Sequence, residues 1–147
     1  MGKKSQRANK SPLSAREGKV YIDGTLVADT CKFQLVFTPK VWEGKTLNEH
    51  GTNRRWIGYD ITGTIEQWKT SSMFKKKVMD YIKKGKTPEF QIQGINTDEN
   101  SDYYEKNKGD KVTAIGCVMT GDIPLMELDT NGDVVKESIK FGAKDLV

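Results

Sequence analysis

Residues 18–37, GKVYIDGTLVADTCKFQLVF, decide the fold class of this chain. They contain Asp23-Gly24, a dipeptide that favours the tight turn of a β-hairpin, with alternating apolar residues on both sides. Beyond the hairpin, apolar and polar residues continue to alternate, as expected for a strand with one buried face. The apolar positions of this second run are Cys31, Phe33, Leu35 and Phe37.

Two further stretches, residues 56–68 and 89–95, show the same two-residue period. In WIGYDITGTIEQW, we expect the face that carries Ile61 and Ile65 to point into a core and the opposite face to be polar. In EFQIQGI, the aromatic and aliphatic residues are expected inward. Many strands, tight turns and a single helix predict a mainly β fold, in which two antiparallel sheets form a barrel-like sandwich flanked by that helix.

The one clear helix signal lies at residues 72–84, within SSMFKKKVMDYIKKGKTPEF. Ser71 or Ser72 can supply the N-cap oxygen, Gly85 occupies the position of a left-handed C-cap, and Pro88 blocks continuation. An apolar stripe is expected to cover the sheet, while lysines point outward, either as a solvated face or as a docking patch. The stripe consists of Phe74, Val78, Tyr81 and Ile82.

Residues 38–55, TPKVWEGKTLNEHGTNRR, follow no sustained period and are predicted to form a long loop. Loops of this length are uncommon in compact domains and usually have a function. The large apolar side chains of Trp42 and Leu47 indicate that the loop either docks on a partner or folds back on its own domain.

The chain has 147 residues, with 24 Lys and Arg against 20 Asp and Glu, and 35% of its residues are hydrophobic. This length argues for one domain, residues 17–147, with a core that needs no disulfide or metal. Residues 1–16 are basic and have no apolar run, so we expect a flexible arm rather than a signal peptide. No segment reaches transmembrane length, and no stable membrane association is expected.

The residues of this chain offer no catalytic or cofactor site. His50 is the single histidine, so a histidine metal site or a Ser-His-Asp triad has no partners. The run DTNGD at residues 129–133 begins like a calcium loop but lacks the later glycine and glutamate, so we interpret it as a turn. Cys31 and Cys117 fit no metal spacing and are expected to be free, buried thiols. We therefore expect no enzymatic activity, no cofactor and no metal.

A soluble β-barrel that binds single-stranded nucleic acid is the main alternative. Such a barrel carries exposed aromatic residues interleaved with basic ones on one sheet face. Here the aromatic residues fall on predicted core faces, and the polar faces carry threonine, glutamine and glutamate, which suit phosphate poorly. The aromatic residues in question are Phe33, Phe37, Tyr59 and Phe90.

Three segments of the chain share a pattern with a known family: the first hairpin, the strand that leads into SSM, and the helix end with the strand after it. The matching residues are Gly18, Val20, Ile22, Asp23, Gly24, Val27, Ala28, Gly58, Thr62, Gly63, Ile65, Ser71, Ser72, Met73, Ile82, Gly85, Lys86, Pro88, Phe90 and Ile92. From about residue 15 to the end, the chain resembles the tail-tube proteins of contractile phages, specifically the PBSX prophage XkdM-like family. These positions mark the fold, so the resemblance concerns architecture first.

The resemblance implies homohexameric rings that stack into the hollow inner tube of a contractile tail. The tube would be a conduit for DNA in a phage, or a membrane-piercing needle in a phage-tail-like bacteriocin. The implied partners are further copies, the tail sheath protein, and the baseplate and tail-terminator proteins, with DNA only as passing cargo. The implied location is the virion or tail-like particle, assembled in the bacterial host cytoplasm. A secreted tube of the related type VI machinery, with other partners, is a second alternative.

Three groups of residues take on roles under this resemblance. A conduit wall should not hold phosphate, so polar and nearly neutral side chains suit the lumen, unless that face is ordinary solvent-facing sheet. The lumen-facing candidates are Gln34, Thr62, Thr64, Glu66, Gln91 and Gln93. The predicted inter-ring contacts are Trp42, Leu47, Arg54 and Arg55. The outer helix lysines, as a solvated face or a sheath contact, are Lys76, Lys83 and Lys84.

Overall fold

The computed structural model describes residues 18–69, 72–97 and 110–147. Its elements, in chain order, are β1 (Gly18–Ile22), β2 (Thr25–Leu26), β3 (Thr30–Gly44), β4 (Asn53–Trp68), α2 (Met73–Lys84), β5 (Phe90–Asn96), β6 (Asp110–Met119), β7 (Lys136–Ala143) and β8 (Asp145–Leu146). The expected basic arm, residues 1–16, lies outside the described residues. The expected mainly β class, with one helix in the described part of the chain, is confirmed.

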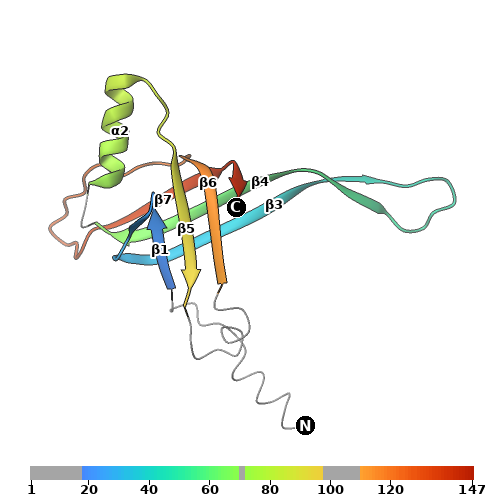
Figure 1. The fold of residues 1–147 in the computed structure, drawn as a ribbon, viewed down its shortest axis with the longest axis horizontal. Helices are drawn as coiled ribbons and strands as arrows, with labels where there is room; N and C mark the ends of the chain where they lie inside the picture. The colour runs from blue at the N-terminus through green and yellow to red at the C-terminus, as the bar shows by residue number, and fades with distance from the viewer. Residues whose placement is uncertain (1–17, 70–71, 98–109) are drawn as a thin grey trace, which may run out of the picture.

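The strands form one antiparallel path in the order β2-β1-β5-β6-β7-β4-β3, with β8 paired to β6. The two expected sheets are thus joined, and we call β1, β2 and β5 the front half and β3, β4 and β7 the back half. Strand β6 links them, because residues 110–117 pair with β5 whereas Val118 and Met119 pair with β7. Figure 1 shows β1, β5 and β6 running steeply across the back half.

The bend that lets β6 serve both halves lies at Gly116. Its φ of 62° is in the left-handed region, which glycine adopts without steric cost. A Cβ added here would lie only 2.9 Å from the Cβ of Lys144. The β5–β6 pairing also shifts register close to this point, between Phe90 and Ile92. A glycine and a bulge together are a common way to turn a strand from one sheet to another.

The core lies between the inner faces of the two halves. Its buried residues are Val20, Ile22, Ile65, Phe74, Phe90, Ile92, Ala114, Cys117, Ile139 and Phe141. The Phe90 ring meets Phe74 and Phe141 edge-on, at centroid distances of 6.4 and 5.6 Å. The expected inward faces of residues 61–67 and 90–92 are confirmed.

The two cysteines are both free, as expected, but only one is buried. Burial raises the pKa of the Cys117 thiol to about 11, so this group stays neutral and unreactive. The expectation that Cys31 is buried is wrong. The pairing of β3 with β4 is irregular between Thr30 and Lys32, so Cys31 falls in a bulge and leaves the alternation of the strand.

Helix α2 begins at Met73, within one residue of the expected start. Ser72 is the N-cap residue and its carbonyl accepts the Lys76 N–H at 2.8 Å, but its side chain makes no capping hydrogen bond. Ser71, the other candidate, lies outside the described residues. Gly85 adopts the expected left-handed C-cap, with φ 73°, and donates its N–H to the Tyr81 carbonyl at 2.8 Å.

The expectation that α2 is a lid over the sheet is wrong for most of its length. Phe74, in the first turn, is buried against the core, whereas Tyr81 and Ile82 are exposed, the latter by 67%. Figure 1 shows the reason, since the helix rises away from the sheet after its first turn. The apolar stripe therefore anchors the helix at one end and leaves its distal half uncovered.

The expectation of a long loop at residues 38–55 is also mostly wrong, because residues 38–44 and 53–55 belong to strands. The β3–β4 pairing runs from Thr30 opposite Gln67 to Gly44 opposite Asn53, which leaves only residues 45–52 as a connection. We call residues 37–59 the arm, and Figure 1 shows it projecting far beyond the other strands. A two-stranded ribbon is solvated on both faces, so it lacks the apolar–polar alternation that marks a half-buried strand.

Candidate assembly surfaces

The four predicted inter-ring residues gather at the distal part of the arm. Trp42 lies opposite Arg55, and Glu43 opposite Arg54, in the β3–β4 pairing. The Nε of Arg54 and the Oε1 of Glu43 are 3.3 Å apart in an exposed ion pair. Leu47 lies in the connection and is 94% exposed, which is unusual for a leucine that covers nothing. Their contact with another ring remains a prediction.

The connection at the arm tip, residues 45–52, has a defined shape. The Glu49 carboxylate accepts the Thr46 N–H at 3.1 Å and the Asn53 side-chain amide at 2.6 Å. The hydrogen bond from the Thr46 backbone, followed by those from the two side chains, lowers the pKa of Glu49 below its ordinary value. The tip therefore presents Leu47 from an ordered turn.

An aromatic patch, formed by Phe37, Trp56 and Tyr59, lies exposed on the arm. The Phe37 ring is stacked on Tyr59 at a centroid distance of 5.4 Å and tilted against Trp56 at 5.5 Å. In the β3–β4 pairing, Lys40 lies opposite Gly58 but the next residue, Val41, lies opposite Trp56, so Ile57 is left unpaired in a bulge. This bulge places Trp56 on the same face of the strand as Tyr59. Phe37 and Tyr59 were expected in the core, and that expectation is wrong, because neither the front half nor β7 reaches this part of the hairpin.

The patch is tied to the end of the chain by one polar contact. The Tyr59 hydroxyl donates to Asp145 Oδ1 at 3.3 Å, and the negative charge of Asp145 raises the pKa of Tyr59. Sequence reasoning missed the patch as a surface. The register shift at Ile57, which brings the patch together, has no signature in the sequence.

Four of the six lumen-facing candidates share the outer face of the back half. Gln34 lies opposite Thr64 in the β3–β4 pairing, and Thr62 and Glu66 alternate with the buried residues of β4. Strand β7 adds outward residues to the same face that were not among the candidates, namely Lys136, Ser138 and Lys140. The alternation of KESIKFGA predicts these positions, but it does not predict that β7 lies next to β4.

Gln91 and Gln93 lie on the other outer face of the molecule. Gly94, on the inner side of β5, packs so closely against the back half that a Cβ would lie 2.6 Å from the Phe33 ring. Gln93 points away from that contact and donates to the Thr113 hydroxyl at 3.1 Å. The six candidates therefore do not share one surface, because each strand's period fixes its two faces but not the half of the sheet to which it belongs.

The three outer helix lysines, Lys76, Lys83 and Lys84, are exposed on α2 as expected. Lys77 differs from them, since its Nζ lies 3.6 Å from Asp23 Oδ2 and 6.0 Å from the centroid of the Phe90 ring. Lys77 thus helps to anchor the base of the helix. The contact of the other lysines with a sheath remains a prediction.

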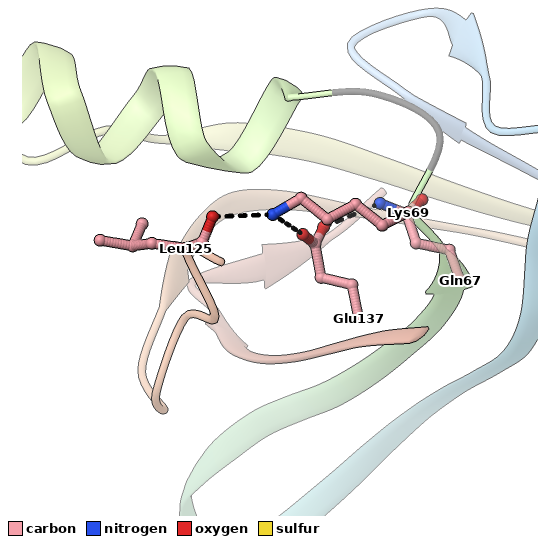
Figure 2. A network of polar contacts seen from close by, with 4 residues as sticks. All are labelled: Gln67, Lys69, Leu125 and Glu137. Atoms are coloured by element: carbon pink, nitrogen blue, oxygen red, sulfur yellow. Dashed lines mark hydrogen bonds and ion pairs between the residues drawn. The ribbon is translucent and has the colours of Figure 1, made fainter. Parts of the chain in front are cut away.

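A buried polar network fixes the connection between β6 and β7, residues 120–135 (Figure 2). Lys69 Nζ donates to the Leu125 carbonyl at 3.1 Å and lies 3.5 Å from Glu137 Oε2. Gln67 donates to the other oxygen of Glu137 at 3.1 Å, and the Lys69 N–H bonds to the Val135 carbonyl at 2.9 Å. Glu137 is only 2% exposed, so losing one partner would leave a buried charge uncompensated.

A cleft of about 790 Å³ lies between the front half and β3. Its lining mixes apolar residues, such as Val20, Phe33 and Val112, with charged ones, such as Lys19 and Asp110. Within the described ranges, no three His, Cys, Asp or Glu side chains come together to hold a metal ion. In that same part of the chain, no helix has the length and apolar character needed to cross a bilayer.

The family model described as phage tail tube protein matches residues 6–146. The chain belongs to the phage tail tube protein family. The resemblance inferred from the sequence is thereby confirmed, together with the structural tail-tube role and the tail or tail-like particle as the place of this tail tube protein. The match spans nearly the whole chain, so it includes the arm, helix α2 and both halves of the sheet.

Curated and solved relatives agree with this membership. The tail tube protein is 26% identical over 133 residues to the phage-like element PBSX protein XkdM of Bacillus subtilis strain 168, covering 90% of this chain and 87% of XkdM. A chain of the six-fold symmetrised anti-feeding prophage baseplate has the same fold, with a TM-score of 0.65, 10% identity and coverages of 94% and 95%. A chain of an extracellular contractile injection system, the PVC sheath–tube complex in the extended state, also has this fold. Its TM-score is 0.65 at 12% identity, and the match covers 97% of this chain and 95% of that chain.

Proposed function

We propose that this tail tube protein forms homohexameric rings that stack into the inner tube of a contractile tail. The arm is the observation that carries the proposal, because several of its large apolar side chains are 42–94% exposed within the described chain. They are Val41, Trp42, Leu47, Trp56 and Ile57. Apolar groups of this size on an ordered ribbon become stable contacts when a second surface covers them. Since every copy carries the same arm, the contact repeats from copy to copy and builds an assembly.

The lumen wall is proposed to be the outer face of the back half. Within residues 18–69, 72–97 and 110–147, no helix lies over this face and β3 ends the strand path, so its outer edge is proposed to pair with a neighbouring copy. Gln34, Thr62 and Thr64 are neutral, and Lys32 lies opposite Glu66. Lys136 and Lys140 are the further cations of the face. A wall with few fixed cations allows DNA to slide. Gln91 and Gln93 are assigned to the outside of the ring.

The remaining expectations follow from this arrangement. The sheath, baseplate and terminator are proposed as protein partners, in keeping with a sheath–tube complex and a baseplate among the structurally similar assemblies. DNA is proposed as passing cargo only. The protein is proposed to have no enzymatic activity, because its described residues bring no nucleophile, base and orienting group together in a cleft.

Electron microscopy of the purified full chain tests the proposal. At moderate salt we expect rings or hollow tubes in negative stain, and no shift of labelled single-stranded DNA in a gel. Leu47→Asp combined with Trp42→Ala should abolish the tubes without unfolding the protein, because both side chains are exposed. Tubes that form equally well in this variant would contradict the assigned role of the arm.

A nucleic-acid-binding protein is retained as a second candidate because of the aromatic patch. Phe37, Trp56 and Tyr59 are exposed on a ribbon that also carries Arg54 and Arg55, which is a combination suited to stacking bases beside phosphates. This candidate predicts monomers that shift single-stranded DNA in a salt-sensitive manner. It also predicts that Trp56→Ala weakens binding by about 1–3 kcal/mol, since stacking on one ring would be lost.

A further inference from the structure

Helix α2 carries an exposed ridge of mixed character that runs from its first turn to its last. Lys76, Met79 and Lys83 are separated by three, four and seven residues, and Ile82 follows Met79 by three, so the four lie on one side of the helix. Met79 and Ile82 are exposed although they are large and apolar. We call these four residues the helix ridge. Two apolar side chains between two lysines form a surface suited to an apolar partner with carboxylates at its margins.

A surface of the opposite charge lies in the connection between β6 and β7. Residues 120–135, TGDIPLMELDTNGDVV, contain four carboxylates and no lysine or arginine, and we call them the acidic strap. The strap also exposes large apolar side chains, and Leu128 is 87% exposed. Its carboxylates are Asp122, Glu127, Asp129 and Asp133. Its exposed apolar residues are Leu125, Met126, Leu128 and Val134.

The strap is irregular but held in place. Lys69 fixes it at the Leu125 carbonyl and at the Val135 carbonyl, as Figure 2 shows for the Leu125 contact. Ile123 packs against the core, and the Asn131 N–H bonds to Asp129 Oδ1 at 3.0 Å in a local turn. A surface ordered before binding loses less conformational entropy when a partner covers it. Exposed leucine and methionine on such a fixed path indicate a docking surface rather than a loose loop.

The ridge and the strap do not satisfy each other within one chain. Among the described residues, the ion pairs are Arg54–Glu43, Lys69–Glu137 and Lys77–Asp23, and none of them joins the two surfaces. The strap lies beside the first turn of α2, across a cleft of about 250 Å³ lined by Ser72, Lys75 and Met126, among others. The ridge begins at Lys76 in the first turn, but Met79, Ile82 and Lys83 belong to the later turns, which rise away from the sheet and from the strap (Figure 1).

We propose that the helix ridge of one copy docks on the acidic strap of a second copy. The inference rests on the proposed function, because it names a contact through which the copies of the tube protein join. Charge complementarity selects this occupant, since lysines meet carboxylates while Met79 and Ile82 meet the exposed apolar residues of the strap. Two different patches of one chain form a heterologous contact, which repeats from copy to copy and so suits rings or stacked rings.

Charge reversal with mixing tests the contact. In the ridge variant, Lys76→Glu and Lys83→Glu, and in the strap variant, Glu127→Lys and Asp133→Lys, we expect the concentration needed for tube formation to rise at least about tenfold. Mixing the two variants in equal amounts should restore tubes, because each reversed ridge then finds a reversed strap and each native ridge a native strap. The mixture also has the net charge of the wild type, and its recovery proves that both variants are folded.

Two controls separate this contact from other effects. Lys84→Glu with Lys86→Glu makes the same change in net charge off the ridge and should leave tube formation unchanged. A chain with all four ridge and strap reversals should assemble by itself. Tubes of either reversed variant at the wild-type concentration, or a loss that mixing does not repair, would overturn the proposal. In particular, if the fourfold variant forms tubes but the mixture does not, the ridge and the strap contact each other within one chain rather than between copies.

The outcomes also distinguish this inference from the proposed function. If the wild type and both reversed variants form tubes at the same concentration, the tube role is retained and the ridge–strap contact is excluded. A wild-type chain that never self-associates would overturn both.

Discussion

The β3–β4 hairpin has two parts, the base and the arm, which differ in how far the rest of the subunit covers them. In the base, the inner side of β4 carries Ile61 and Ile65, which are both buried, and Ile65 packs in one core cluster with Ile22 and Ile92 of the front half. In the arm, the same strand carries Trp56 and Ile57, which are 65% and 66% exposed. Strand β7 pairs with β4 only from Ile61 onward, so the third strand and the second layer end where the arm begins.

This difference separates two uses of apolar residues in one strand. Those in the base stabilise the subunit, because folding removes them from water. Those in the arm contribute much less to the subunit, since the described residues leave them largely exposed. Their apolar area is available to a second molecule. We therefore expect substitutions in the base to lower the free energy of unfolding and substitutions in the arm to impair tube formation.

The largest expected effect comes from one isoleucine in each part. Ile65→Ala should reduce the free energy of unfolding by about 2–5 kcal/mol, because it leaves a cavity in a closely packed core. Ile57→Ala is the matched control on the same strand and should change it by less than about 0.5 kcal/mol. Urea unfolding of the unassembled protein measures both values. A comparable loss in the two variants would mean that the arm is covered within the monomer.

Two glycines of β4 sharpen the comparison at a smaller scale. A Cβ at Gly63 would lie 2.4 Å from the Phe141 ring and 2.8 Å from the Gln34 carbonyl oxygen, whereas one at Gly58 meets only the Lys40 side chain at 3.5 Å. We expect Gly63→Ala to cost about 1–3 kcal/mol through overpacking and Gly58→Ala to be nearly neutral. Thermal unfolding of both variants tests this, and equal melting temperatures would show that the base tolerates a closer approach than described.

The smallest expected effect is a change with pH that is confined to the arm tip. The pKa of Glu49 is lower in the folded tip than in an unfolded chain, because the ionised carboxylate accepts the Thr46 and Asn53 hydrogen bonds. Ionisation therefore stabilises the tip at pH above the ordinary glutamate value, and this contribution is lost as the pH falls through the lowered value.

An NMR titration measures this effect. The Thr46 amide shift should follow the lowered pKa of Glu49, while the Ile65 amide stays unchanged over the same acid range. Glu49→Gln should remove the transition at Thr46. A titration at the ordinary glutamate value would argue against the hydrogen-bonded tip.

The same comparison explains which parts of the fold the sequence predicts. Periodicity identified the strands of the base and their inner residues, because one face is buried and the other is wet. It failed for residues 38–55, since both faces of the arm are exposed and no alternation remains. It also assigned Tyr59 to the core, because a period defines a face of the strand without defining what covers that face.

The candidate surfaces follow the same rule. The arm-tip group, with Trp42 and Leu47, is close together because a single hairpin contains it. The lumen set divided because Gln34 and Gln91 lie on strands whose placement depends on the bend at Gly116, which is a property of the whole sheet. The aromatic patch forms because the β3–β4 register skips Ile57, and the strap is held because Lys69 bonds to the backbone carbonyl of Leu125. Neither feature has a signature in the sequence.

The long antiparallel pairing of the arm also has a mechanical consequence. When the tip is pulled along the ribbon, both strands carry the tension through their covalent backbones, and the cross-strand hydrogen bonds within the arm bear little load. The force arrives at the base, where β7 holds β4 from Ile61–Ala143 to Trp68–Lys136. Those hydrogen bonds are perpendicular to the strands and are loaded together in shear, rather than peeled one after another. The arm is thus a tether whose rupture point lies inside the subunit.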